Sequence, residues 1–201
     1  MKWIVSLFIV FQFGALGTVY AGGFTASNEF TEGRDTNSVQ AVQSLEAYAK
    51  YKMGQYQEAR EIWLKLAEKN NTSALINLAN IYEEGQGVKR DLKQSIAWLR
   101  KAAKLGDSRG QYQLAMAYEK NMGVERDLMQ AAKWFEKAAV QGDGNAQFSI
   151  GVLLATNYGK GLATSSNDQR KEASKWLALA KEKDIEDATG FLTLLTSMKN
   201  Q

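Results

Sequence analysis

The chain has 201 residues, 45% of them hydrophobic, and contains no Cys, His or Pro. Without Cys and His it can form no disulfide, zinc–thiolate site, or Cys- or His-based nucleophile, so neither a metal nor another cofactor is predicted. Its 25 Lys and Arg and 22 Asp and Glu are interspersed and give a net charge of +3. This balance provides no electrostatic reason to expect nucleic acid or an anionic membrane as a partner.

An uncharged apolar stretch follows Lys2 and runs to Gly23. Val19 and Ala21 are spaced like the small residues that precede a secretory cleavage site, so residues 1–21 are predicted to be a signal peptide. Export would then leave no membrane-inserted segment after cleavage. Because the apolar stretch approaches the ~20 residues that span a bilayer, an uncleaved anchor is the alternative.

Residues 22–38 are rich in Gly, Ser, Thr and Asn and show no apolar periodicity, so they are expected to form a flexible segment. From residue 39 onward, apolar residues recur at three- and four-residue spacing almost to the end of the chain. No run alternates between apolar and polar residues for long enough to build a sheet. An all-α protein is therefore predicted.

Two segments 36 positions apart have nearly the same sequence, GVKRDLKQSIAWLRKAAKLGD at 87–107 and GVERDLMQAAKWFEKAAVQGD at 123–143. A unit this short cannot bury its own apolar face and must stack on a copy. The period is marked by Trp residues, each followed four positions later by Ala: Trp63–Ala67, Trp98–Ala102, Trp134–Ala138 and Trp176–Ala180. The Ala residues are expected where helices approach closely, with the Trp side chains filling the space between units.

Each unit has the pattern of a helix, a Gly-containing turn and a second helix. Leu78, Leu114 and Ile150 form the inward stripe of successive first helices. Helix N-caps are predicted at Asp91, Asp107, Asp127 and Asp143, and the first and third of these have a Gln three residues later, as capping boxes do. In one turn Asn121 takes the place of the first Gly, and Asn tolerates the left-handed conformation that the turn requires.

These motifs, Leu-Ala-x-x-Tyr, Gly-x-Gly-Val, Asp, Trp, Lys-Ala-Ala and Gly-Asp, resemble the Sel-one-like repeat, a relative of the tetratricopeptide repeat. The resemblance implies an α-solenoid of antiparallel helix-turn-helix repeats that forms a right-handed superhelix over residues 39–201. Repeats are expected at about 39–71, 72–107, 108–143 and 144–184, with a capping helix at 185–198. The first unit is more similar to a tetratricopeptide repeat. The repeat style and the leader together indicate a bacterial protein of the periplasm or the medium.

The fourth unit is longer than the others, because the Trp spacing widens from 36 to 42 residues. The additional residues fall in the turn at Asn157–Asn167. This insertion is either a recognition loop or an ordinary surface insertion.

The resemblance implies a non-catalytic, monomeric adaptor or regulatory scaffold that binds a protein or peptide on its concave face. Two alternatives stay open: a carbohydrate-binding protein or hydrolytic enzyme that uses carboxylates, and a structural subunit of an envelope assembly. Glu83, Glu84 and Glu119 could supply carboxylates, but repeated exposed Glu residues more often solvate a helix face, and no nucleophile lies near them in the sequence.

By analogy with tetratricopeptide units, the binding side is expected two residues before and two residues after the inward stripe, since each residue rotates a helix by ~100°. One row is Ile76, Tyr112 and Phe148, the next is Asn80, Met116 and Val152, and Ser73, Arg109 and Asn145 lie near the helix starts. Such a surface would take an extended or helical peptide. The alternative is that Tyr112 and Phe148 complete the core between neighbouring helices.

Overall fold

The computed structural model describes residues 29–199, so the predicted signal peptide and residues 22–28 lie outside the described residues. The described part is built of helices joined by turns and contains no strand, which confirms the prediction of an all-α protein. The helices are α1 (Glu29–Lys52), α2 (Tyr56–Glu68), α3 (Thr72–Glu84), α4 (Leu92–Lys104), α5 (Ser108–Lys120), α6 (Leu128–Val140), α7 (Gly144–Ala155), α8 (Asn167–Lys181) and α9 (Glu186–Lys199), with a short 3-10 helix η1 (Leu162–Thr164) between α7 and α8.

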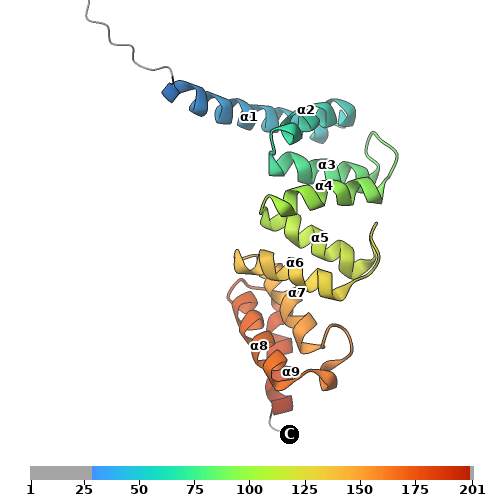
Figure 1. Ribbon diagram of the computed structural model, residues 1–201, viewed down its shortest axis with the longest axis vertical. Coiled ribbons are helices and arrows are strands. Elements are labelled where there is room, and N and C mark those ends of the chain that lie inside the picture. Colours follow the sequence, from blue (N-terminus) through green and yellow to red (C-terminus); the bar gives the residue numbers. More distant parts are fainter. Residues whose placement is uncertain (1–28, 200–201) are drawn as a thin grey trace, which may run out of the picture.

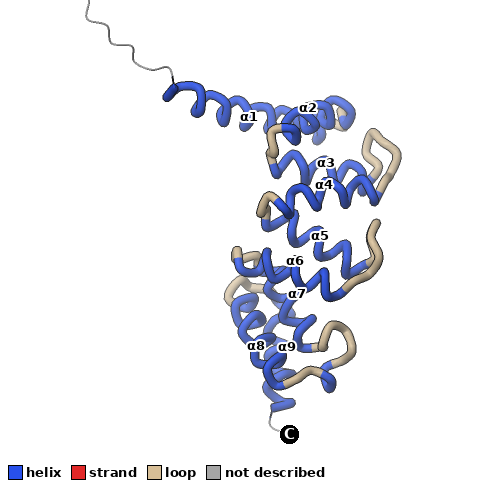
Figure 2. The backbone as a smooth tube through the Cα atoms, viewed as in Figure 1, coloured by secondary structure: helices blue, strands red, loops and turns tan. Residues whose placement is uncertain are grey.

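The helices stack in chain order into an elongated array, and each helix packs against the next one from α1 to α9 (Figure 1). The first helices of neighbouring repeats also meet, because α3 contacts α5 and α7 contacts α9. The loops within repeats gather at one edge of the array and the short turns between repeats at the other (Figure 2). The protein is therefore an α-solenoid of helix-turn-helix repeats.

Helix α1 begins earlier than the sequence pattern indicated. Residues 29–38, expected to be flexible, form its first turns. Extending an existing helix adds one hydrogen bond for each residue fixed and needs no new nucleus, and no Pro stands in the way.

The predicted helix caps are present. The carboxylates of Asp91, Asp107, Asp127 and Asp143 each accept a backbone N–H in the first turn of the following helix. Asn121 holds the left-handed conformation with φ +59°. The reciprocal Gln bond of a capping box is formed within the described residues at Ser166–Gln169, and not after Asp91 or Asp127 as predicted. The Asp side chains thus start these helices without help from the Gln residues.

The core runs along the array as linked clusters, one after another. Leu78 and Leu114 are fully buried and Ile150 is nearly so, which confirms the inward stripe. Ala67, Ala102, Ala138 and Ala180 are buried as well, as their predicted close contacts require. Trp98 and Trp134 each pack against two successive clusters, so these side chains join the repeats as predicted.

The turn that carries the insertion, residues 156–166, is tied together by its own hydrogen bonds. The Asn157 amide donates to the Thr164 carbonyl at 3.2 Å, and its Oδ1 accepts from Gln169 Nε2 at 3.1 Å. Asn157 and Tyr158 have positive φ angles of +44° and +54°. The additional residues therefore form an ordered turn that ends at the capping box of α8.

Candidate functional site

A groove lies between the first helices of two successive repeats, α3 and α5, with α4 as its floor. We call it the central groove; its volume is about 380 Å³. Its floor includes Ile96 and Leu99, both nearly buried. Asn80, Tyr112 and Met116 line it, so three of the predicted binding residues come together here.

The central groove also holds one polar residue, Gln113, that sequence reasoning did not single out, beside Glu83 and Glu84, which it considered as carboxylates. Gln113 lines it, and its Oε1 is buried with no hydrogen-bond partner in the described part of the chain. Leaving a buried acceptor unpaired costs about 1–3 kcal/mol, so a donor from a bound molecule would recover that free energy. Glu83, Glu84 and Lys120 also line the groove and give it charges of both signs. Repetition did not reveal Gln113, because the matching residues in neighbouring repeats, Asn77 and Ser149, are of other types.

Tyr112 is shared between the central groove and the core. Its ring packs against Phe135 with the centroids 5.6 Å apart, and the residue is half-buried. Burial, reinforced by the negative charges of Asp143 and Glu119, raises the pKa of the Tyr112 phenol. The phenol is therefore protonated at neutral pH and can donate a hydrogen bond.

Arg109 and Ser73 form a polar link between the starts of α5 and α3. Arg109 Nη2 donates to Ser73 Oγ at 3.1 Å and to the Asp107 carboxylate at 3.3 Å. Asp107 also caps α5 by accepting from the backbone of Arg109 and Gly110. Burial of the Asp107 carboxyl acts to raise its pKa, but hydrogen bonds from Thr72, Arg109 and Gly110 lower it on balance. Arg109 is therefore already engaged in holding two repeats together.

The remaining predicted residues do not continue the groove as one open row. Ile76 is 5% exposed and belongs to the core of the first repeats. The Phe148 ring packs edge-to-face on Phe191 of α9 at 5.7 Å, and Val152 lies in the same cluster. Asn145 is exposed at the start of α7. The capping helix α9 thus covers Phe148, as the core alternative expected for that residue, and Ile76 at the other end of the row is enclosed in the core of the first repeats.

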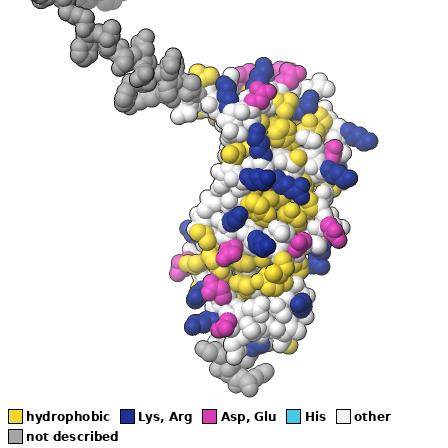
Figure 3. Space-filling model, in the orientation of Figure 1, with side chains coloured by type: hydrophobic (Ala, Val, Ile, Leu, Met, Phe, Trp, Pro, Cys, Tyr) yellow, Lys and Arg dark blue, Asp and Glu magenta, His cyan; other side chains and the backbone are white. Residues whose placement is uncertain are grey.

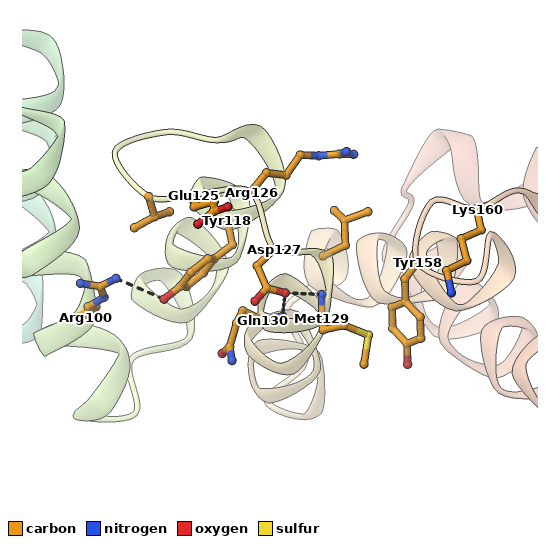
Figure 4. A pocket seen from close by; sticks show the side chains of 11 residues that line it. Arg100, Tyr118, Glu125, Arg126, Asp127, Met129, Gln130, Tyr158 and Lys160 are labelled. Atoms are coloured by element: carbon orange, nitrogen blue, oxygen red, sulfur yellow. Dashed lines mark hydrogen bonds between the residues drawn. The ribbon is translucent and has the colours of Figure 1, made fainter.

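A second cavity, of about 910 Å³, lies where the loops of two successive repeats meet (Figure 4). We call it the turn-edge pocket; among its lining residues are Arg100, Tyr118, Arg126, Asp127, Tyr158 and Lys160. The Arg100 guanidinium donates to the Tyr118 hydroxyl at 3.3 Å, and the Asp127 carboxylate caps α6. Arg126 donates to the Glu119 carbonyl at 3.1 Å. Most of its charged groups therefore already serve the fold.

The sequence analysis did not predict the turn-edge pocket as a site. It did identify the insertion at Asn157–Asn167, which contributes Tyr158 and Lys160 to the pocket. Arg90 occupies in the preceding repeat the position of Arg126, and its Nε donates to the Glu83 carbonyl at 2.8 Å. An Arg that recurs at the same position of two successive repeats and bonds the end of the first helix fixes the turn in both of them. This signal indicates structure more than recognition.

Within residues 29–199, no helix is both long and apolar enough to cross a membrane. The same residues contain no group of three Asp, Glu, His or Cys side chains placed to hold a metal ion.

A linear stack of helical hairpins with a groove between first helices defines the protein as an α-solenoid repeat protein. The Sel1 repeat pattern matches residues 72–107, 108–143 and 145–184. These matches cover more than half of the chain, and the chain therefore belongs to the Sel1 repeat family. This confirms the resemblance drawn from the motifs. The hairpin of α1 and α2 lies outside the matched residues.

Two solved structures of bacterial proteins are similar to this chain. The Sel1 repeat protein from Oxalobacter formigenes is 28% identical with a TM-score of 0.66, over 75% of this chain and 60% of that one. A protective antigen present in uropathogenic Escherichia coli strains, which displays an SLR fold, is 32% identical with a TM-score of 0.61, over 68% of this chain and 28% of that one. The present chain thus matches less than two thirds of either protein. No curated protein matches it.

Proposed function

We propose that this protein is a non-catalytic adaptor that binds a protein or peptide partner in the central groove. The proposal rests on two features of this groove. Its floor contains the buried apolar residues Ile96 and Leu99, and beside them the buried acceptor Gln113 Oε1 has no hydrogen-bond partner within the described residues. Sites of this kind orient a ligand by a few polar groups while apolar contacts supply affinity. Membership of a family of repeat scaffolds supports the same conclusion.

The occupant that fits is a short peptide segment with one apolar side chain directed at the floor. The Gln113 side chain as a whole is half-buried, so a rotation that turns Oε1 outward would let it accept from a backbone N–H of the segment. Asn80 and the Tyr112 phenol would bond the segment's remaining polar groups. The groove passes from α3 to α5, so the site exists only where two repeats are stacked. Ser73 and Arg109 support it from one end by joining the starts of these helices.

A groove-blocking variant should abolish binding without harming the fold. Asn80→Arg places a long side chain in the groove, where it can pair with Glu84 one turn later, so we expect little change in unfolding free energy. Loss of a central contact of this kind costs at least about 2 kcal/mol, which corresponds to a partner affinity about 30-fold weaker. Gln57→Arg, on an exposed position of α2, is the matched control.

The absence of Cys makes the partner identifiable. A single Cys introduced by Asn80→Cys and coupled to a benzophenone should give one crosslinked adduct in an extract of the exported fraction, identified by mass. Unlabelled wild-type protein should compete for the adduct, and the Asn80→Arg variant should not. Equal adducts from Gln57→Cys, or equal competition by both proteins, would move the site away from the central groove.

We further propose export of the protein, as the charge, apolar stretch and Val-Tyr-Ala of the leader indicate. The intact mass of the protein from fractionated cells should correspond to a chain beginning at Gly22. Recovery of the uncleaved chain in the membrane fraction would support the anchor instead. Recovery of the uncleaved chain in the cytoplasm would contradict export altogether.

A further inference from the structure

Opposite charges line the two walls of the central groove. Glu84 is the last residue of α3 and Lys120 the last residue of α5, and both side chains are exposed. The two residues are 36 positions apart, so they hold the same position in successive repeats. Glu83, half-buried beside Glu84, also lines the groove. The α3 wall is therefore acidic at this end, and the α5 wall is basic.

None of these three side chains forms an ion pair within residues 29–199. The ion pairs in the part of the chain that the structure describes are Lys50–Glu58, Asp107–Arg109 and Glu172–Lys175. Arg90 lies near the same end of α3, but its Nε donates to the main-chain carbonyl of Glu83, and Arg90 does not line the groove. The carboxylates of Glu83 and Glu84 and the ammonium of Lys120 are therefore available to a bound molecule.

The opposed charges belong to this groove and are not a feature of the repeat itself. Thr156 holds the equivalent position at the end of α7, and its hydroxyl donates to the Val152 carbonyl at 2.8 Å. A like charge at every repeat would keep one helix face solvated, whereas a change of sign between neighbours makes a pattern that a ligand can match. The sign changes from Glu84 to Lys120, across the groove proposed above as the binding site.

The surface gives a charged partner no broad field to follow. On the face of the molecule shown in Figure 3, Lys and Arg are interspersed with Asp and Glu between apolar patches. The whole chain has a net charge of only +3. Electrostatic selection of a partner therefore depends on individual charges close to the floor of the groove.

The central groove suits an extended segment. The carboxamides of Asn80 and Gln113 can pair with main-chain N–H and C=O groups, which an extended segment leaves free and a helix uses internally. An extended chain advances ~3.3 Å per residue, and packed helix axes lie ~8–10 Å apart. A segment that crosses from α3 to α5 with one side chain on the floor thus has its preceding and following residues above the two walls. Because side chains alternate, these two point away from the floor, at the level of the exposed Glu84 and Lys120.

We propose that the central groove recognises an extended segment in which an apolar residue is flanked by one basic and one acidic residue, an inference that rests on the function proposed above. The apolar side chain contacts Ile96 and Leu99 on the floor. The Lys or Arg of the segment pairs with Glu84 and Glu83, and its Asp or Glu pairs with Lys120. The same walls disfavour a segment with two like charges, because one of the two would meet its own sign.

Selection of peptides tests this charge rule. Short random peptides displayed on phage are enriched on the protein purified from cells that express the full-length gene, and the wild type should enrich an apolar residue flanked by one charge of each sign. Lys120→Glu makes both walls acidic and should enrich two basic flanks. Glu84→Lys combined with Glu83→Gln makes both walls basic and should enrich two acidic flanks. A peptide selected on the wild type should bind each variant about three- to ten-fold more weakly, since an attraction is replaced by a repulsion.

Lys93→Glu on α4 and Glu61→Lys on α2 are matched controls, because they change exposed charges outside the groove and should select the same flanks as the wild type. Melting temperatures should stay at the wild-type value throughout, since no ion pair is lost. Peptides that the Asn80→Arg variant fails to bind, but whose flanks are the same from every other variant, would overturn the charge rule and leave the groove as the binding site. Peptides that bind the Asn80→Arg variant as well as the wild type, or no enrichment at all, would contradict the proposed function together with this inference.

Discussion

Phe135→Ala should lower the free energy of unfolding by about 3–5 kcal/mol, the usual cost of truncating a buried aromatic residue. Phe135 is fully buried on α6, in the cluster that joins the third and fourth repeats, and its ring contacts Tyr112. Repeats of a solenoid are stabilised mainly by their neighbours, so the loss falls on the coupling between the two halves of the array. We therefore expect a broader urea transition with a smaller slope as well as a lower midpoint.

Val140→Ala is the matched control, because Val140 lies on the same helix and is 72% exposed. Its cost should be ~0.5 kcal/mol or less. Urea unfolding followed by circular dichroism measures both free energies of unfolding. A loss below about 1 kcal/mol for Phe135→Ala would contradict the burial of Phe135 in the core between these repeats.

Gly123→Ala should cost about 2–5 kcal/mol, of which about 1–2 kcal/mol is the left-handed backbone and about 1–3 kcal/mol is overpacking. Gly123 has φ +70°, and a Cβ atom there would lie 2.6 Å from the Leu92 carbonyl oxygen. Backbone atoms at the start of a helix cannot move aside as a flexible side chain can. The turn would therefore have to shift away from α4.

Gly142→Ala separates the two contributions. Gly142 also has a positive φ, +90°, but a Cβ atom there would have nothing within 4 Å. Its cost should be the backbone contribution alone, about 1–2 kcal/mol. Equal midpoint shifts for the two variants in urea would show that the contact with Leu92 carries no free energy.

The binding surface shows where sequence periodicity stopped being informative. Positions two residues from the inward stripe did include Asn80, Tyr112 and Met116 of the central groove. The same rule placed Phe148 on an open surface, although α9 covers it through Phe191. Periodicity gives the face of a helix on which a residue lies, but another segment of the chain decides whether that face is covered.

The repeat architecture was determined by the sequence alone. Hydrophobic spacing, the period marked by Trp134 and its equivalents, and Asp caps such as Asp107 act within one helix or between adjacent helices. Local interactions of this kind recur in each unit, so the pattern is legible without knowing how the units stack. Asn121 in the left-handed conformation is another example, since the turn requirement is met by that residue itself.

The contacts between one repeat and its neighbour could be determined only from the tertiary structure. The second Gly of the turn lies against the first residue of the preceding repeat's second helix: Gly87 against Tyr56, and Gly123 against Leu92. The sequence motif showed a Gly suited to a positive φ, but not the close approach that excludes a Cβ atom. The unpaired Gln113 acceptor is of the same kind. It depends on the positions of neighbouring helices, which a pattern within one helix does not contain.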